Sequence, residues 1–121
     1  MSDTPPASAT PSIPVEKNGE ALIARPQVKM MDDAHLKALG QAIDQNAGED
    51  SGISLIVIDL SKVQLLPSLA LGLLIQVSNK CKSRQQKLKL AAVQAPVRQV
   101  FAITRLDRIF EFAPTVEAAM E

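Results

Sequence analysis

Apolar residues in this chain follow two patterns, short continuous runs and stripes with helical spacing. Residues 55–60 (Leu-Ile-Val-Ile-Asp-Leu) form a run rich in β-branched side chains, which predicts a strand buried on both faces. Residues 87–93 alternate between polar and apolar positions, which predicts another strand. Helices are predicted at about residues 32–47, 68–83, 96–105 and 115–120. The first half of the second helix is apolar nearly all round, so we expect it to lie deep against the sheet.

Three weaker strand signals complete the pattern. Residues 13–17 and 20–25 flank Asn18-Gly19, a dipeptide typical of tight hairpin turns, and residues 110–112 form a short edge-like strand. Strands that alternate with helices are joined by right-handed crossovers and form mostly parallel sheets. The sequence therefore predicts an α/β fold with a mixed, mostly parallel sheet of four or five strands and about four helices. The opening hairpin supplies an antiparallel edge.

The first twelve residues differ in composition from the rest of the chain. Residues 1–12 consist mostly of Pro, Ser, Thr and Ala, and such a segment buries too little apolar surface to offset the entropy of ordering. We expect a flexible tail there and one folded domain over residues 13–121. The chain of 121 residues is 46% hydrophobic but only 2% aromatic, so the core must be aliphatic.

Composition and charge argue against several classes of function. Thirteen Lys and Arg balance thirteen Asp and Glu, and Trp and Tyr are absent, which disfavours nucleic-acid binding. One cysteine and one histidine cannot form a dedicated metal site, and no glycine-rich phosphate loop or nucleophile–base motif indicates a cofactor or an enzyme. No segment has membrane-spanning length and the N-terminus lacks a signal-peptide pattern, so we expect a cytoplasmic protein without membrane insertion. Composition gives no oligomeric state.

Individual side chains with chemical potential have structural explanations. Asp59 is the best-placed acid, at the carboxyl end of a strand, and capping the turn that follows is its alternative role. We expect His35 at the surface or boundary, because nothing nearby in the sequence orients it, and Cys81 as a small core residue. Five basic residues predict a solvated face, with binding of an acidic partner as the alternative: Lys80, Lys82, Arg84, Lys87 and Lys89.

Three segments resemble one known family. Residues 56–61, residues 97–110 with their Leu-Asp-x-hydrophobic-Phe ending, and residues 114–120 with their Glu-x-Ala pattern are similar to the STAS family (sulfate transporter and anti-sigma factor antagonist domains). The resemblance spans residues 13–120 and is nearest to the small bacterial anti-sigma factor antagonists. It implies the STAS fold.

The resemblance also implies a function. Such proteins bind a protein partner, typically an anti-sigma factor kinase, through the second helix and the loop before it, in signal transduction and transcription regulation. Phosphorylation of a serine at the start of that helix blocks the partner. The resemblance therefore implies a non-catalytic protein-binding module. A scaffold or an accessory subunit of a signalling or ABC-transport complex is the alternative.

The loop before this helix departs from the family. The family Asp falls on Pro67, the phosphoacceptor serine on Leu69 and the glycine on Ala70, whereas Ser68 matches the family's first serine. Leucine has no hydroxyl, so we expect no phosphorylation switch of the usual kind. The loop from Leu65 onward is apolar and free of carboxylates, which suits a hydrophobic contact. The expected partner-binding residues are Leu66, Pro67, Ser68, Leu69 and Ala70.

Two residues in the matching segments carry alternatives. We expect Ser68 to be the N-cap of its helix, with its hydroxyl bonded to the amides of the first turn. We do not expect it to present that hydroxyl where Leu69 points, because one residue of helix turns a side chain by about 100°. A displaced phosphosite at Ser68 is the alternative. Arg105 falls where the family usually has a glycine in the left-handed conformation. Either the helix continues or the arginine is kept for a contact, and we expect the turn simply to relax.

Overall fold

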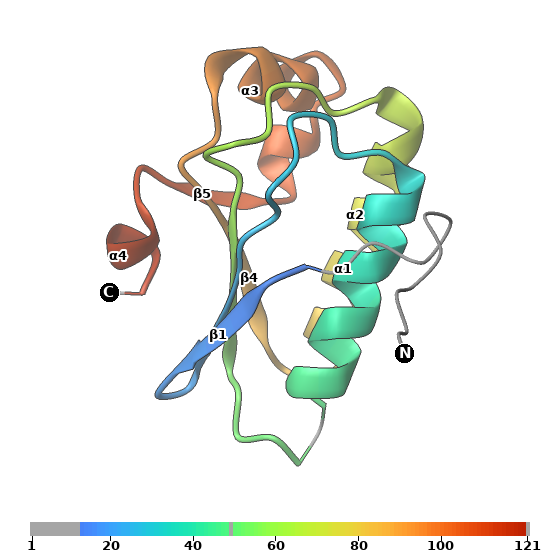
Figure 1. The fold of residues 1–121 in the computed structure, drawn as a ribbon. Helices are drawn as coiled ribbons and strands as arrows, with labels where there is room; N and C mark the ends of the chain where they lie inside the picture. The colour runs from blue at the N-terminus through green and yellow to red at the C-terminus, as the bar shows by residue number, and fades with distance from the viewer. Residues whose placement is uncertain (1–12, 49, 121) are drawn as a thin grey trace, which may run out of the picture.

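The computed structural model describes residues 13–48 and 50–120, and the predicted tail at residues 1–12 lies outside them. Strands and helices alternate along the described chain (Figure 1), which confirms the predicted α/β pattern. The elements are β1 (Val15–Asn18), β2 (Ala21–Ala24), α1 (Asp33–Asn46), β3 (Leu55–Asp59), α2 (Ser68–Ser83), β4 (Lys87–Ala91), α3 (Ala95–Ile103), the 3-10 turn η1 (Leu106–Arg108), β5 (Glu111–Ala113) and α4 (Val116–Ala119).

The five strands form one sheet in the order β1-β2-β3-β4-β5. β1 pairs antiparallel with β2 across the predicted hairpin turn, where Gly19 has a φ of 62°, and the other three pairs are parallel. β3 lies in the middle of the sheet, with Val57 opposite Ile23 of β2 and Lys89 of β4. The predicted mixed, mostly parallel sheet is confirmed.

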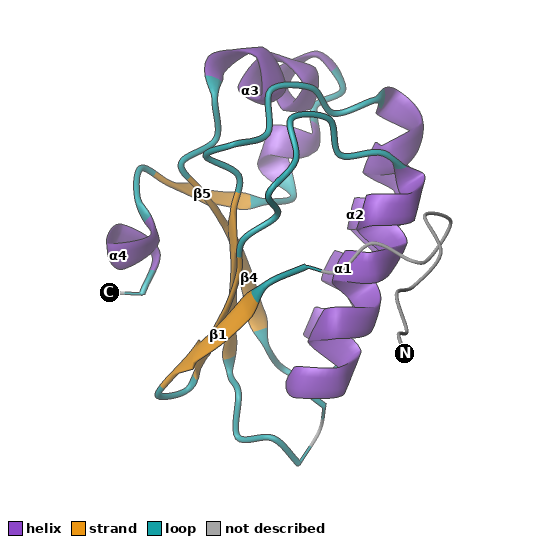
Figure 2. Ribbon diagram, viewed as in Figure 1, coloured by secondary structure: helices purple, strands orange, loops and turns teal. Residues whose placement is uncertain are grey.

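The sheet separates two hydrophobic clusters, and helices cover both of its faces (Figure 2). Helices α1 and α2 lie together against one face, α4 lies against the other, and α3 lies at the same end of the sheet as the loops after β2 and β3. Ile56 and Ile58 of β3 belong to the large core under α1 and α2, whereas Val57 belongs to a smaller cluster with Val116 and Ala119 of α4. Both faces of β3 are therefore buried, which explains its unbroken apolar sequence.

The chain after α3 differs from expectation. α3 ends at Ile103, and Arg105 has φ 64° and ψ 18°, which is the left-handed conformation. Our prediction that the turn relaxes around this arginine is wrong, because the left-handed turn is kept without glycine. A side chain there costs on the order of 1 kcal/mol. β5 begins one residue later than predicted, because the backbone N–H of Phe110 donates to the carbonyl of Leu106 at 3.2 Å and so still belongs to the turn after α3.

Candidate protein interface at the start of helix α2

Asp59 anchors the loop that leads from β3 to α2. Its Oδ1 accepts a hydrogen bond from the backbone N–H of Ser61 at 3.0 Å, and its Oδ2 accepts one from Nη1 of Arg25 at 3.0 Å. The Asp59 side chain is only 13% exposed, so its charge is largely satisfied inside the protein. The turn-capping alternative for Asp59 is confirmed.

A backbone bridge fixes the middle of this loop to the loop after β2. The N–H groups of Gln64 and Leu65 both donate to the carbonyl of Lys29, at 2.7 and 2.9 Å, and the N–H of Met31 donates to the carbonyl of Leu65 at 3.0 Å. Met30 and Leu65 are paired in this bridge although they are far apart in the sequence. The two loops therefore form one surface.

Helix α2 begins without a side-chain cap. Pro67 occupies the N-cap position in an extended conformation (φ −62°, ψ 147°), and Ser68 is the first helical residue. Our prediction that Ser68 caps the helix is wrong, because its backbone is already helical and the proline before it has no side-chain oxygen to accept a hydrogen bond. The first turn of α2 also lacks an acidic residue. The positive end of the helix dipole is therefore not offset by a carboxylate within that turn.

The five residues predicted to bind a partner divide by burial. Leu66 and Ala70 are 2% and 1% exposed and belong to the large core, where they hold the loop and the helix in place. Leu69 is 89% exposed, Ser68 is exposed and Pro67 is half-buried. The expectation that the first half of α2 lies deep against the sheet is wrong at Leu69. Pro67, Ser68 and Leu69 are the members of this group that another molecule can reach.

Exposed apolar side chains gather at the start of α2. Five large apolar side chains are exposed among the described residues, and three of them lie here: Met30 (45%), Leu65 (53%) and Leu69 (89%). We call these three residues the apolar patch. Sequence reasoning pointed to the two leucines and missed Met30. The position of Met30 depends on hydrogen bonds between two loops, for which the sequence has no local signal.

Asp32 caps α1 just beyond this patch. Its Oδ1 accepts a hydrogen bond from the backbone N–H of His35 at 3.1 Å and lies 2.6 Å from Nδ1 of the same histidine. The backbone hydrogen bond from His35 is the largest cause of a lowered pKa at Asp32. The expectation that nothing near in the sequence orients His35 is wrong, because the cap three residues earlier fixes its ring. His35 itself lies at the boundary, as predicted, with 21% of its side chain exposed.

Two of the five grouped basic residues are paired within the protein. Nζ of Lys80 lies 3.3 Å from Oδ2 of Asp44, and Arg84 donates to Oδ1 of the same carboxylate. Burial acts to raise the pKa of Asp44, but the hydrogen bonds from Arg84 and Lys80 outweigh it and lower that pKa. Cys81 is buried as predicted, and this burial raises the pKa of its thiol to about 11. These residues join α1 to α2.

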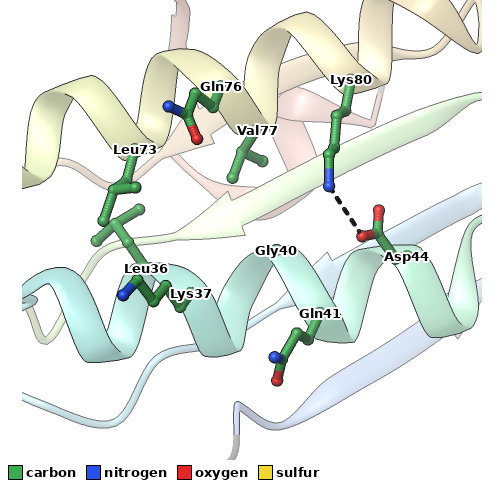
Figure 3. Close-up of a pocket in the computed structure, with 9 residues that line it drawn as sticks. All are labelled: Leu36, Lys37, Gly40, Gln41, Asp44, Leu73, Gln76, Val77 and Lys80. Atoms are coloured by element: carbon green, nitrogen blue, oxygen red, sulfur yellow. Dashed lines mark hydrogen bonds and ion pairs between the residues drawn. The ribbon is translucent and has the colours of Figure 1, made fainter.

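A groove of about 220 Å³ runs between α1 and α2 (Figure 3). Leu36 of α1 and Leu73 and Val77 of α2 give it an apolar lining, and the ion pair of Lys80 with Asp44 lies at one end. Within residues 13–48 and 50–120, no group of three or more His, Cys, Asp or Glu side chains is placed to hold a metal ion. The helices of this same part of the chain are too short or too polar to cross a membrane.

Several solved structures share this fold, among them anti-sigma factor antagonists and part of a murine anion transporter (Slc26a9), which has a TM-score of 0.73 and 15% identity over 87% of this chain and 18% of that one. A candidate antagonist from Thermotoga maritima has a TM-score of 0.77 and 21% identity over 89% of this chain and 91% of that one. A STAS-domain antagonist from Planctomyces limnophilus has a TM-score of 0.76 and 19% identity over 91% of this chain and 96% of that one. An antagonist from Mycobacterium paratuberculosis has a TM-score of 0.73 and 25% identity over 90% of each chain. The predicted STAS fold is confirmed. The family profile of the STAS domain matches residues 12–119, nearly the whole sequence, and the chain belongs to the STAS domain family.

Proposed function

We propose that this STAS domain is a non-catalytic regulatory module of the anti-sigma factor antagonist type, which recognises an anti-sigma factor kinase through the start of α2. The observation that carries the proposal is the exposure of Leu69. This leucine lies in the first turn of α2, is 89% exposed, and forms the apolar patch together with Met30 and Leu65. The likeness to three antagonists of the same fold supports the type of module.

The apolar patch can supply free energy of binding. Complete burial of a leucine side chain contributes about 1.5–3 kcal/mol. Because Leu69 is almost fully exposed in the free protein, most of that free energy is still available when a partner covers it. Three backbone hydrogen bonds hold the two loops of the patch together, so the surface needs little ordering when a partner binds. A fixed and exposed apolar surface suits a constitutive protein contact.

We further propose that phosphorylation does not switch this contact in the usual way. Leu69 stands where the family phosphoacceptor falls, and leucine offers no hydroxyl to a kinase. Ser68 is exposed and does not cap the helix, but it lies about 100° away from Leu69 around the helix axis and does not replace the family's acceptor position. Without a phosphate at this position, no added charge repels the partner at the start of α2.

The test uses the anti-sigma factor kinases encoded in the source genome, each purified and incubated with this chain and ATP. We expect at least one kinase to bind in isothermal titration calorimetry, and we expect the intact mass of this chain to stay unchanged. Stoichiometric phosphate on Ser68 would overturn the unswitched contact. Affinity purification that recovers only ABC-transporter subunits would favour the scaffold role instead.

Leu69→Asp locates the contact. It should weaken kinase binding at least about tenfold, because the variant loses apolar cover and places a carboxylate in the interface. Ile103→Asp is the matched control, since Ile103 is 79% exposed on a different helix, α3. Both variants should fold, because neither residue contributes to the core; the melting temperature should rise slightly in Leu69→Asp and fall slightly in Ile103→Asp, since the new acid lies at the positive end of α2 in one and at the negative end of α3 in the other. Equal loss of binding in both variants, or in neither, would contradict a contact centred on Leu69.

A further inference from the structure

A hollow of about 360 Å³ lies next to the apolar patch. It opens between the loops that follow β2 and β3, close to the residue that precedes α3. These loops lie at the carboxyl ends of the parallel strands β2 and β3. The polar residues that line the hollow are Gln27, Lys29, Ser61, Lys62, Gln64 and Gln94.

The lining of the hollow is positively charged. Lys29 and Lys62 are its charged residues, and its described lining contains no carboxylate. The neighbouring strand-end acid, Asp59, is already paired with Arg25 at 3.0 Å. Residues 60–70, between β3 and the first turn of α2, contain Lys62 as their single charged residue. In a chain whose thirteen acids balance its thirteen bases, the hollow is a local excess of positive charge.

Hydrogen bonds hold three side chains of the hollow in place, those of Gln27, Lys62 and Gln94. Nζ of Lys62 donates to Oε1 of Gln27 at 2.6 Å, and Nε2 of Gln27 donates to the carbonyl of Arg25 at 2.8 Å. Nε2 of Gln94 donates to the carbonyl of Ser61 at 2.6 Å. An ammonium group has three N–H donors, so Lys62 can donate to an incoming anion while it keeps its bond to Gln27. The hollow is therefore prearranged to accept an anionic group.

We propose that the partner places a carboxylate side chain in this hollow while a neighbouring apolar side chain covers the apolar patch. Lys29 and Gln64 line the hollow, and the residues that follow them in the sequence, Met30 and Leu65, belong to the patch. The backbone bridge fixes these two pairs against each other. The partner surface that fits is one on which Asp or Glu stands beside large apolar residues. The inference rests on the proposed function, because both require a protein partner at this surface.

Charge reversal tests the hollow with the anti-sigma factor kinase that binds the unaltered chain. Lys62→Glu and Lys29→Glu should each weaken binding at least about tenfold, and Lys62→Gln should weaken it about threefold, because paired charges across an interface become like charges or are lost. Lys82→Glu is the matched control, since Lys82 is an exposed lysine in the last turn of α2. It changes the net charge equally and should leave affinity unchanged. Thermal melts verify that each variant folds. If a charge-reversal variant does not fold, the affinity of Lys62→Gln decides whether the lysine contributes to kinase binding.

A second measurement needs no kinase. The ¹⁵N-labelled chain is titrated with the peptide acetyl-Glu-Leu-Glu-Leu-amide and with a twin in which lysine replaces glutamate. We expect the glutamyl peptide to shift the amide signals of residues 27–30 and 61–65, and we expect the lysyl peptide to leave them unchanged.

The outcomes separate this inference from the proposed function. Kinase binding that is lost in Leu69→Asp but unchanged in both lysine reversals would overturn the acidic partner and leave the proposed function in place. If no kinase binds, the proposed kinase contact fails and the peptide pair decides the inference. Selective shifts with the glutamyl peptide then support the anion-accepting hollow, and equal or absent shifts overturn it.

Discussion

Arg105→Gly tests how this chain builds a turn for which its family usually uses glycine. Arg105 has φ 64° and ψ 18° between α3 and η1. Relief of the left-handed strain should stabilise the variant by about 1–2 kcal/mol, and the greater freedom of glycine in the unfolded chain should offset about 0.4–1 kcal/mol of that. The expected net gain is about 0.5–1 kcal/mol. It corresponds to a rise of a few degrees, about 2–5 °C, in the melting temperature of a domain of this size.

The contacts of Arg105 support this sign. Its backbone N–H donates to the carbonyl of Ala102 at 3.1 Å, and glycine keeps that bond. Its side chain is exposed and takes part in no hydrogen bond or ion pair with the other residues that the structure describes. Substitution therefore removes backbone strain without removing a polar contact inside the protein.

Urea unfolding followed by circular dichroism measures the change, with two comparison variants. Gln85→Gly should give a similar gain, because Gln85 has a φ of 61°, whereas Ala102→Gly, inside α3, should lower stability by about 0.5–1 kcal/mol. A loss of stability in Arg105→Gly alongside a gain in Gln85→Gly would refute the reasoning. Increased stability combined with weaker kinase binding would instead show that the arginine is kept for a partner.

Three further predictions concern a cap, a thiol and an ion pair. Ser68→Ala should leave the free energy of unfolding within about 0.3 kcal/mol of wild type, because Ser68 does not cap α2. Thr115→Ala should lower the free energy of unfolding by about 1 kcal/mol, because the Thr115 hydroxyl caps α4. Urea unfolding measures both changes. Cys81 should resist an aromatic disulfide reagent at pH 8 until the protein unfolds, since it is buried with a pKa of about 11; rapid reaction of the folded protein would count against this. Asp44→Asn should lower the melting temperature at pH 7, and this penalty should shrink as the pH falls below 3.8, because a lowered folded-state pKa gives stabilisation that is present above the unfolded value of 3.8 and is lost as pH falls through the folded value.

Strands and helices are predictable where the local pattern and the packing require the same conformation. The apolar run at residues 55–60 predicts a fully buried strand, and β3 is covered on both faces. The boundaries after α3 were not predictable in this way. They depend on the left-handed backbone of Arg105 and on Phe110, whose backbone N–H donates to the carbonyl of Leu106 at 3.2 Å. Both are turn conformations that the periodicity of apolar residues does not record.

The predicted cap at Ser68 failed for a related reason. A serine before an apolar helix is a common N-cap signal, but the register of α2 is set by the residues that must face the core. Ala70, Leu74 and Cys81 lie on the buried side of α2, and Pro67 in extended conformation takes the cap position before it. Ser68 is therefore the first helical residue of α2 and not its N-cap.

The same register explains why Leu69 is exposed. Leu69 lies on one side of α2 with Gly72 and Gln76, three and seven positions further on, and all three residues are exposed. A leucine on this side adds nothing to the core, and a polar residue in its place would leave the stability of the fold almost unchanged. Its apolar surface is available to another molecule. The first turn of α2 around it has no side-chain cap and no acidic residue, and Leu69 itself replaces the serine that the family phosphorylates. The difference in burial therefore gives these neighbours different roles. Leu66 and Ala70 pack in the core and fix the loop and the helix, whereas Leu69 is exposed and can contact a partner.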